Sequence, residues 1–283
     1  MYLLQRLVLH RASPRAAFAG RLLAALIGAA PVLLAACGVA QQHPSPTSAV
    51  PTSTGMSTDT PAPSPTPEPP LVYLTAHGNP DLPEIALTFD DGPALQYTED
   101  ILQVLRSHHV KATFFMLGRW VQQYPDLARE VVADGHAVGD HSWSHADLTQ
   151  ISASQAMQEL TSTRDIIQQV TGVKTTLFRP PYRAYNRQIL DLASSLHLST
   201  ILWSIDPHDW EMPGVGPIIS TALGNAQNGA IILMHDGGGD RSQTVTALSS
   251  VIEQLQAQGF SFVTIPEMLS HLPPNRSGGG NNP

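Results

Sequence analysis

Two adjacent carboxylates, Asp90 and Asp91, stand where a predicted core strand ends. Residues 85–89 are mostly apolar and include a β-branched Thr and a terminal Phe, a composition typical of a buried strand. Gly92 and Pro93 then predict a turn. Side chains alternate along extended backbone, so the two carboxylates are expected to point in different directions. Two like charges at the rim of a core need a cation or a basic group nearby, and without one the pair is better interpreted as a solvated turn.

His141 and His145 supply two imidazoles four residues apart, after another short apolar stretch. Residues at this spacing are neighbours in a helix or a tight turn. Two histidines and a carboxylate form a common ligand set for a divalent transition metal. A histidine pair alone on a surface loop usually has no such role. Asp91, which follows another strand, is the candidate third ligand.

The elements that would position these residues follow from the apolar periodicity between residues 85 and 265. Several predicted helices have Ser or Pro near the start and Gly at the end. Strands are expected at 85–89, 112–117, 136–139, 175–179, 199–205, 230–235 and 260–265. Helices are expected at 98–109, 125–135, 152–172, 186–197, 217–226 and 244–258.

Strands separated by helices form parallel sheets through right-handed crossovers. Seven such strands fit either a barrel, closed or nearly so, or an open doubly wound sheet. A barrel assembles its site from many strand ends, whereas an open sheet concentrates it at one switch point. Polar side chains follow five of the predicted strands: Asp90 and Asp91, Asp140 and His141, Arg179, Asp206 and Asp209, and His235. We therefore expect an α/β fold, a barrel of about seven parallel strands.

Five segments of the chain resemble, in order, the five motifs of the polysaccharide deacetylases, the NodB-homology domain of carbohydrate esterase family 4. The segments are Thr88–Pro93, His141–His145, Arg179–Tyr182, Asp206–Trp210 and Leu233–His235. Each motif alone is weak, but all five in order are specific, and the resemblance covers essentially residues 85 to 270. It implies the distorted (β/α) barrel of that family.

The resemblance also implies a role for each matching residue. Asp91, His141 and His145 would bind one divalent metal ion, with Zn expected and Co, Mn or Ni as alternatives. Asp90 would be the general base that takes a proton from the attacking water, and Arg179 would orient it. This assignment supplies the compensation that two adjacent carboxylates require.

On the leaving-group side, the resemblance makes His235 the general acid, with Asp209 orienting it and raising its pKa. The backbone N–H of Tyr182 would stabilise the oxyanion. Trp210 and Leu233 would line an apolar pocket for the acetyl methyl group. The alternative for Arg179 is an ordinary structural ion pair, and the alternative for Trp210 and Leu233 is packing in the core.

Other residues near these motifs are interpreted as structural. Asp206 is expected to cap the turn before Pro207, His208 to be exposed, and Gly237–Gly239 to form a flexible loop beside the cleft. One departure from the family pattern is Arg183, where Gly is usual. A Gly at this position suggests a positive φ or a close backbone approach. Arg183 therefore puts in question the shape of the substrate rim and the oxyanion contact of Tyr182. Alternatively, Arg183 adds a cation for an acidic glycan.

The first seventy residues predict export and a tether. Residues 1–36 carry four arginines, no acid and an apolar run from Leu22 to Ala36, typical of a secretory signal. The run ends before Cys37, the only cysteine, in a pattern that resembles a bacterial lipoprotein signal. An ordinary cleavage site with an incidental Cys is the alternative. Residues 37–70 are expected to be the lipidated Cys and a disordered linker. The part rich in Pro, Ser and Thr, residues 41–70, would reach roughly 90 Å at about 3 Å per residue.

The catalytic domain is therefore expected at 71–272, followed by a disordered tail at 273–283. One cysteine allows no internal disulfide, so the core alone must hold the domain together. The formal net charge of −8 includes the four arginines of residues 1–36, which makes the rest more acidic still. This charge argues against nucleic acid as a partner. We expect a monomer attached by its lipid to the outer face of the cell membrane.

The resemblance points to a metal-dependent amidase that removes N-acetyl groups from a cell-envelope polysaccharide, either peptidoglycan or another N-acetylglucosamine polymer such as chitin, and releases acetate. An esterase for O-acetyl xylan would use the same machinery. A lipid-anchored glycan-binding protein with an inactive site and a mononuclear iron oxygenase are alternatives from other classes. The complete set of acid, base and ligand positions argues against the first of these, and the barrel pattern argues against the second.

Overall fold

Strand β1 (Glu84–Asp90) pairs with three strands of a seven-stranded sheet in the computed structural model, which describes residues 71–273. The sheet order is β5-β4-β3-β2-β1-β6, with β7 also paired to β1, and every ladder is parallel. The other strands are β2 (Thr113–Met116), β3 (Ala137–Asp140), β4 (Leu177–Phe178), β5 (Ser199–Thr200), β6 (Ala230–His235) and β7 (Ser261–Phe262). The predicted α/β barrel of seven parallel strands is confirmed.

The sheet curls into a distorted barrel, and irregular segments bridge the gap between β5 and β6. Thr75, which precedes β1, pairs with Ile201, and His77 pairs with Ala230 at the start of β6. Further along, Ile205 pairs with Ile232. A regular strand was expected over 199–205, but only residues 199–200 form one, and single bridges follow. The reason is that residues 200–202 form backbone hydrogen bonds with residues 72–75 as the chain crosses from β4 toward β6.

Alternation along β1 divides its side chains between two environments. Ile85, Leu87 and Phe89 belong to the large apolar cluster beneath the outer helices, whereas Ala86 belongs to a second cluster together with residues of α8. Thr88 and Asp90 continue the face of Ala86, since side chains two apart share one face of a strand. Asp90 therefore ends the inward-facing row, beside its Cα partner His235 on β6.

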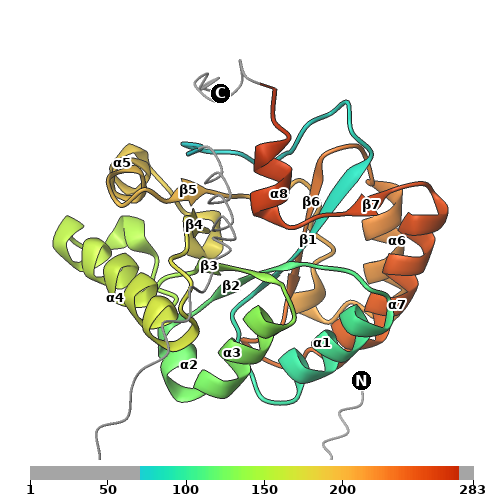
Figure 1. Cartoon of the computed structure of the whole chain (residues 1–283), viewed down its shortest axis with the longest axis horizontal. Helices are drawn as coiled ribbons and strands as arrows, with labels where there is room; N and C mark the ends of the chain where they lie inside the picture. The colour runs from blue at the N-terminus through green and yellow to red at the C-terminus, as the bar shows by residue number, and fades with distance from the viewer. Residues whose placement is uncertain (1–70, 274–283) are drawn as a thin grey trace, which may run out of the picture. The chain divides into compact units, whose positions relative to one another are not determined.

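Helices cover the outside of the sheet, and Figure 1 shows α1, α6 and α7 packed side by side next to β1 and β6. α4 contacts α2, α3 and α5 on the side of β3 to β5. The helices are α1 (Tyr97–Ser107), α2 (Gly118–Gln123), α3 (Pro125–Ala133), α4 (Ala153–Thr171), α5 (Arg187–Ser195), α6 (Val215–Gly224), α7 (Ser242–Ala257) and α8 (Ile265–Ser270). Among residues 71–273, none of the helices combines the length and apolar character needed to cross a membrane.

Two helices were not predicted. α2 is a short helix directly after β2, in a stretch whose few apolar residues show no helical period. α8 follows β7 and begins with a capping box, in which Thr264 and Glu267 bond each other's backbone N–H. Its residues Ile265, Met268 and Leu269 fill the second apolar cluster.

Strand β4 is shorter than the strand predicted at 175–179, because only Leu177 and Phe178 form ladder pairs.

Candidate active site

The polar residues predicted at the strand ends meet at one cleft of about 650 Å³. Because all strands are parallel, their carboxyl ends lie at the same end of the barrel. The residues that line the cleft are Asp90, Asp91, His141, His145, Pro180, Tyr182, Arg183, Trp203, Asp206, Trp210, Leu233, His235, Gly238 and Arg241. Arg179 and Asp209 lie behind this lining, where they contact Asp90 and His235.

Asp90 is held by a buried ion pair with Arg179. The Arg179 side chain is fully buried, and its Nη1 donates to Asp90 Oδ1 at 2.7 Å and to Thr88 Oγ1 at 2.8 Å. Its Nε and Nη2 donate to the carbonyls of Ile201 and Leu202. The guanidinium therefore fixes one carboxylate oxygen of Asp90 and leaves Oδ2 free to act.

Burial raises the pKa of Asp90, and the charge of Arg179, followed by that of His235, opposes the rise without cancelling it. A carboxylate with a raised pKa is a stronger base than an exposed one, which suits it to accept a proton from water.

Asp91, His141 and His145 form a cluster whose ligand atoms all lie within 4.8 Å of one another. Asp91 Oδ1 is 3.2 Å from His145 Nε2 and 3.5 Å from His141 Nε2. This oxygen is buried and has no hydrogen-bond partner among the described residues. A buried carboxylate oxygen between two imidazole nitrogens lacks the partner that a cation would supply. The three residues therefore fit a divalent metal ion.

The histidines present their Nε2 atoms to the cluster. His141 Nδ1 is 2.8 Å from the carbonyl oxygen of Arg179, so Nδ1 carries the proton and Nε2 keeps its lone pair. Burial lowers the pKa of His141 to about 3, which keeps the imidazole neutral and able to bind a metal. The His145 ring packs edge-on against the Tyr182 ring, with centroids 4.4 Å apart.

On the opposite wall, His235 is bound to a buried carboxylate. Its Nδ1 lies 2.7 Å from Asp209 Oδ1, and its backbone N–H donates to Asp209 Oδ2 at 2.8 Å. Thr244 Oγ1 on α7 also donates to Asp209 Oδ2. Burial lowers the pKa of His235, but the hydrogen bond and charge of Asp209 outweigh it, so the net pKa is raised. His235 is thus positioned to carry a proton into the cleft through Nε2.

The loop that follows Arg179 has a backbone conformation that glycine adopts more readily than other residues. Tyr182 has φ 58° and Arg183 has φ 58°, so both residues adopt the left-handed conformation. The Tyr182 N–H has no acceptor among the described residues and is available for an oxyanion. Arg183 thus adopts a left-handed conformation itself, where Gly is usual in the family. Its guanidinium lies 5.2 Å from the centre of the Trp203 ring at the cleft rim.

Leu233 and Trp210 both line the cleft but differ in exposure. Leu233 is 3% exposed and forms part of the floor, whereas Trp210 is 48% exposed at the rim. Asp206 accepts a hydrogen bond from the His208 N–H, so it caps the turn as predicted. His208 is exposed, also as predicted.

The sequence interpretation missed several residues around Asp91. A Cβ on Gly237 would lie 2.3 Å from the Asp91 carbonyl oxygen, and a Cβ on Gly238 would lie 2.5 Å from Asp91 Oδ2. The glycine run therefore packs on Asp91, where we had expected a flexible loop. Arg241 is buried beside it and donates from Nε to the Gly237 carbonyl. A sequence signal for this packing was available: two glycines, Gly237 and Gly238, follow closely after the strand that ends in His235.

Asp236 was also missed. It accepts a hydrogen bond from Thr98 Oγ1 at 2.6 Å, and its other oxygen is buried without a partner among the described residues. Burial, with the charges of Asp91 and Asp90, raises the pKa of Asp236 to about 7. The predictions for residues 1–36, Cys37, the linker to residue 70 and residues 274–283 lie outside the described part of the chain.

Comparisons with known proteins identify the family of the chain. The polysaccharide deacetylase family profile matches residues 77–201. The chain is 39% identical over 189 residues to a peptidoglycan-N-acetylglucosamine deacetylase of Bacillus cereus, covering 66% of this chain and 88% of that protein. It is 37% identical over 194 residues to a chitooligosaccharide deacetylase of Azorhizobium caulinodans, covering 64% of this chain and 92% of that protein.

A solved structure shows the same fold. The crystal structure of the Bc1960 peptidoglycan N-acetylglucosamine deacetylase, in complex with a naphthalenyl hydroxamate, superposes with a TM-score of 0.68 at 34% identity and covers 70% of this chain and 92% of that one. With the barrel and the five motifs gathered at one cleft, these matches show that the chain belongs to the polysaccharide deacetylase family, enzymes that remove acetyl groups from polysaccharides.

Proposed function

We propose that this protein is a metal-dependent N-deacetylase of a cell-envelope polysaccharide, either peptidoglycan or another N-acetylglucosamine polymer, and that it releases acetate. The observation that carries the proposal is the arrangement of Asp90 beside the cluster of Asp91, His141 and His145 in one cleft. The base candidate and all three candidate ligands line the same cleft, so they face one small volume. The names of the two relatives supply the substrate class.

Asp91, His141 and His145 would hold the ion, with Zn expected from two imidazoles and one carboxylate, and Co, Mn or Ni as alternatives. A divalent ion there supplies Lewis acidity to the attacking water and to the acetyl carbonyl. Asp90 Oδ2 takes the proton from that water, while Arg179 keeps Oδ1 fixed and the carboxylate oriented.

The protein's own groups then stabilise the tetrahedral oxyanion and expel the amine. The Tyr182 N–H, which has no acceptor among the described residues, would donate to the developing negative charge. His235 donates its proton to the sugar nitrogen, since an amine leaves readily only when protonated, and Asp209 holds the imidazolium in place. Leu233 forms an apolar floor for the acetyl methyl group, and Trp210 at the rim offers a face on which a sugar ring stacks.

The substrate class is tested by measuring acetate release from a panel: N-acetylglucosamine oligomers, peptidoglycan fragments and acetylxylan, each with added zinc, cobalt or manganese. We expect release from the N-acetylated glycans to exceed that from acetylxylan. A preference for acetylxylan would favour the esterase that shares this machinery. Glycan binding without acetate release from any substrate would instead indicate an inactive glycan-binding protein.

We also propose that the protein is a lipoprotein, exported and anchored through Cys37 to the outer face of the cell membrane. The support is the apolar run before Cys37 and the Pro-, Ser- and Thr-rich stretch after it, which would tether the domain within reach of envelope glycans. In cells given labelled palmitate, the wild-type chain should be labelled and sediment with membranes, and Cys37→Ser should do neither. Equal membrane association of Cys37→Ser would contradict the anchor.

A further inference from the structure

The loop that carries both histidines has a backbone that needs external support. Ser142 has φ 68° and His145 has φ 65°, so two non-glycine residues of residues 141–145 adopt the left-handed conformation. This conformation is strained for residues other than glycine and persists only where the surrounding structure holds it. The position of the His145 imidazole therefore depends on the contacts that hold the loop.

Two of these contacts come from the loop itself. Asp140 Oδ1 accepts a hydrogen bond from the Ser142 N–H at 2.7 Å. Ser142 Oγ in turn accepts one from the His145 N–H at 3.0 Å. Both bonds are local, so they tighten the turn without fixing its distance from the rest of the barrel.

Two backbone bonds tie the first half of the loop to the start of α2: the Gly118 N–H donates to the Ser142 carbonyl at 3.1 Å, and the Arg119 N–H donates to the Trp143 carbonyl at 3.2 Å.

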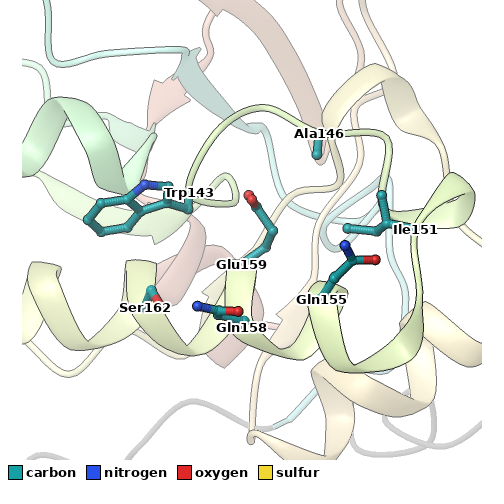
Figure 2. A pocket seen from close by; sticks show the side chains of 7 residues that line it. All are labelled: Trp143, Ala146, Ile151, Gln155, Gln158, Glu159 and Ser162. Carbon is teal, nitrogen blue, oxygen red and sulfur yellow. The ribbon is translucent and has the colours of Figure 1, made fainter.

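Among the hydrogen bonds from other elements to this loop, those nearest to His145 in the chain come from Glu159 on α4. Glu159 Oε2 accepts from the Ser144 N–H at 2.8 Å, and Glu159 Oε1 accepts from Ser144 Oγ at 2.8 Å. Ser144 directly precedes His145, so this two-point contact holds the residue next to the metal ligand. Figure 2 shows the Glu159 carboxylate rising from α4 toward the loop that carries Trp143 and Ala146. Charge-assisted hydrogen bonds of this kind are stronger than neutral ones.

Both oxygens of Glu159 are used by Ser144, and Glu159 has no salt bridge among residues 71–273. It lines a cleft of about 550 Å³ between α4 and the loop, together with Gln155, Gln158 and Ser162 of the same helix. No basic side chain lines this cleft. The carboxylate is therefore committed to the loop and not to an ion pair on the helix surface.

α4 is a rigid support for this contact. A capping box between Ser152 and Gln155 starts the helix, and Gly172 in the left-handed conformation ends it. Ala156, Leu160 and Ile167 are buried against the rest of the fold. Glu159 thus transmits the fixed position of α4 to the loop.

From this geometry we propose that Glu159 is a positioning residue that sets the metal affinity of the Asp91, His141 and His145 site by clamping Ser144. The inference rests on the proposed metal site. Groups that orient metal ligands typically change metal affinity 10- to 100-fold when removed, without touching the metal themselves. Without Glu159, the bonds to α2 still hold Ser142 and Trp143, but Ser144 loses its contact with α4. The His145 imidazole then leaves the position that the other two ligands require.

The test measures zinc affinity of the full chain by competition with a chromophoric chelator, starting from metal-free protein. We expect Glu159→Ala to weaken zinc binding roughly 10- to 100-fold. Glu159→Gln should restore most of the loss, because its amide oxygen can accept from the Ser144 N–H and its NH₂ group can donate to Ser144 Oγ. Acetate release by Glu159→Ala should return toward the wild-type rate when zinc is raised above its new dissociation constant.

Gln155→Ala is the matched control, because it removes the capping box of the same helix and lines the same cleft without touching Ser144. It should lower the melting temperature and leave zinc affinity within about twofold. Unchanged affinity in Glu159→Ala, or an equal loss in Gln155→Ala, would overturn the positioning role while leaving the metal site intact. Failure of the wild-type chain to bind zinc, cobalt or manganese would overturn both the metal site and this inference.

Discussion

At the scale of single residues, the two neighbouring aspartates have separate partners because the backbone changes conformation between them. Asp90 ends the inward-facing row of β1, and Asp91 turns into the left-handed region with φ 75°. Arg179 therefore meets Asp90, while the histidines meet Asp91. A substitution that keeps the shape of one aspartate and removes its charge tests the proposed role of that aspartate separately from the role of its neighbour.

Asp90→Asn tests the role of the base. Because the asparagine amide cannot accept the proton of the attacking water, we expect kcat to fall by about 10² to 10⁴. Zinc content should stay at the wild-type level, since Asp90 is not in the ligand cluster. Acetate release and bound zinc measured on the same preparation check both points. Wild-type activity in Asp90→Asn would remove Asp90 from the mechanism.

Asp209→Asn tests the general acid through the pH profile. Asp209 raises the pKa of His235, so His235 stays protonated to higher pH than an isolated histidine would. Activity that requires protonated His235 is present below this raised pKa and is lost as the pH rises through it. Removing the charge of Asp209 lowers that pKa, and the alkaline limb of kcat should move to lower pH. An alkaline limb that stays in place would show that another group is the acid.

At the scale of elements, the loop after β6 shapes the metal site from outside the ligand set. Gly237→Ala would place a Cβ 2.3 Å from the Asp91 carbonyl oxygen, which is backbone and cannot simply swing away. We expect this variant to weaken zinc binding at least 10-fold because Asp91 must shift. Gly216→Ala in α6 is the control, since its Cβ meets nothing within 4 Å. Equal zinc affinity in the two variants would contradict this packing role.

The sequence predicts which candidate ligand and acid–base residues meet at the cleft, but not what packs around them. Asp90, Asp91, His141, His145, Arg179, Asp209 and His235 all meet as the strand ends and the motifs predicted. Glu159 was missed because it lies on a helix 15 residues from Ser144 in the chain, and nothing local marks its partner. Gly237 was misjudged because its contact with Asp91 depends on how two loops from β1 and β6 approach each other.

In the fold, too, local sequence patterns predict the regular strands but not the contacts between distant segments. The apolar runs predict β1 and β6 well, because these are the longest strands and nearly all their residues are buried. β4 and β5 have two residues each, and the bridge between β5 and β6 comes from residues 75–77, which have no strand pattern. Closure of the barrel is a tertiary property that local periodicity does not encode.

At the scale of the whole molecule, a buried histidine couples stability to pH. His136 accepts a hydrogen bond from the Ala112 N–H between β2 and β3, and burial lowers its pKa from 6.5 to about 4. Its neutral form is favoured in the folded state, so the stability it contributes is present above pH 6.5 and is lost as the pH falls toward 4.

The loss amounts to about 3 kcal/mol at 1.36 kcal/mol per pKa unit. Urea unfolding from pH 7 to 4 should therefore show a steeper fall in the free energy of unfolding for wild type than for His136→Gln, whose amide does not titrate. The difference in slope, and not the absolute stability, is the quantity to compare. Parallel curves for the two proteins would contradict the assignment.

The central claim is that one metal ion at Asp91, His141 and His145 is required for deacetylation. The most direct test strips the purified protein with a chelator and measures acetate release from N-acetylglucosamine oligomers before and after adding one equivalent of zinc. We predict that metal removal abolishes release, that zinc restores it, and that Asp91→Ala is restored by neither zinc nor cobalt. Sustained acetate release by the metal-free protein, or by Asp91→Ala, would contradict the account.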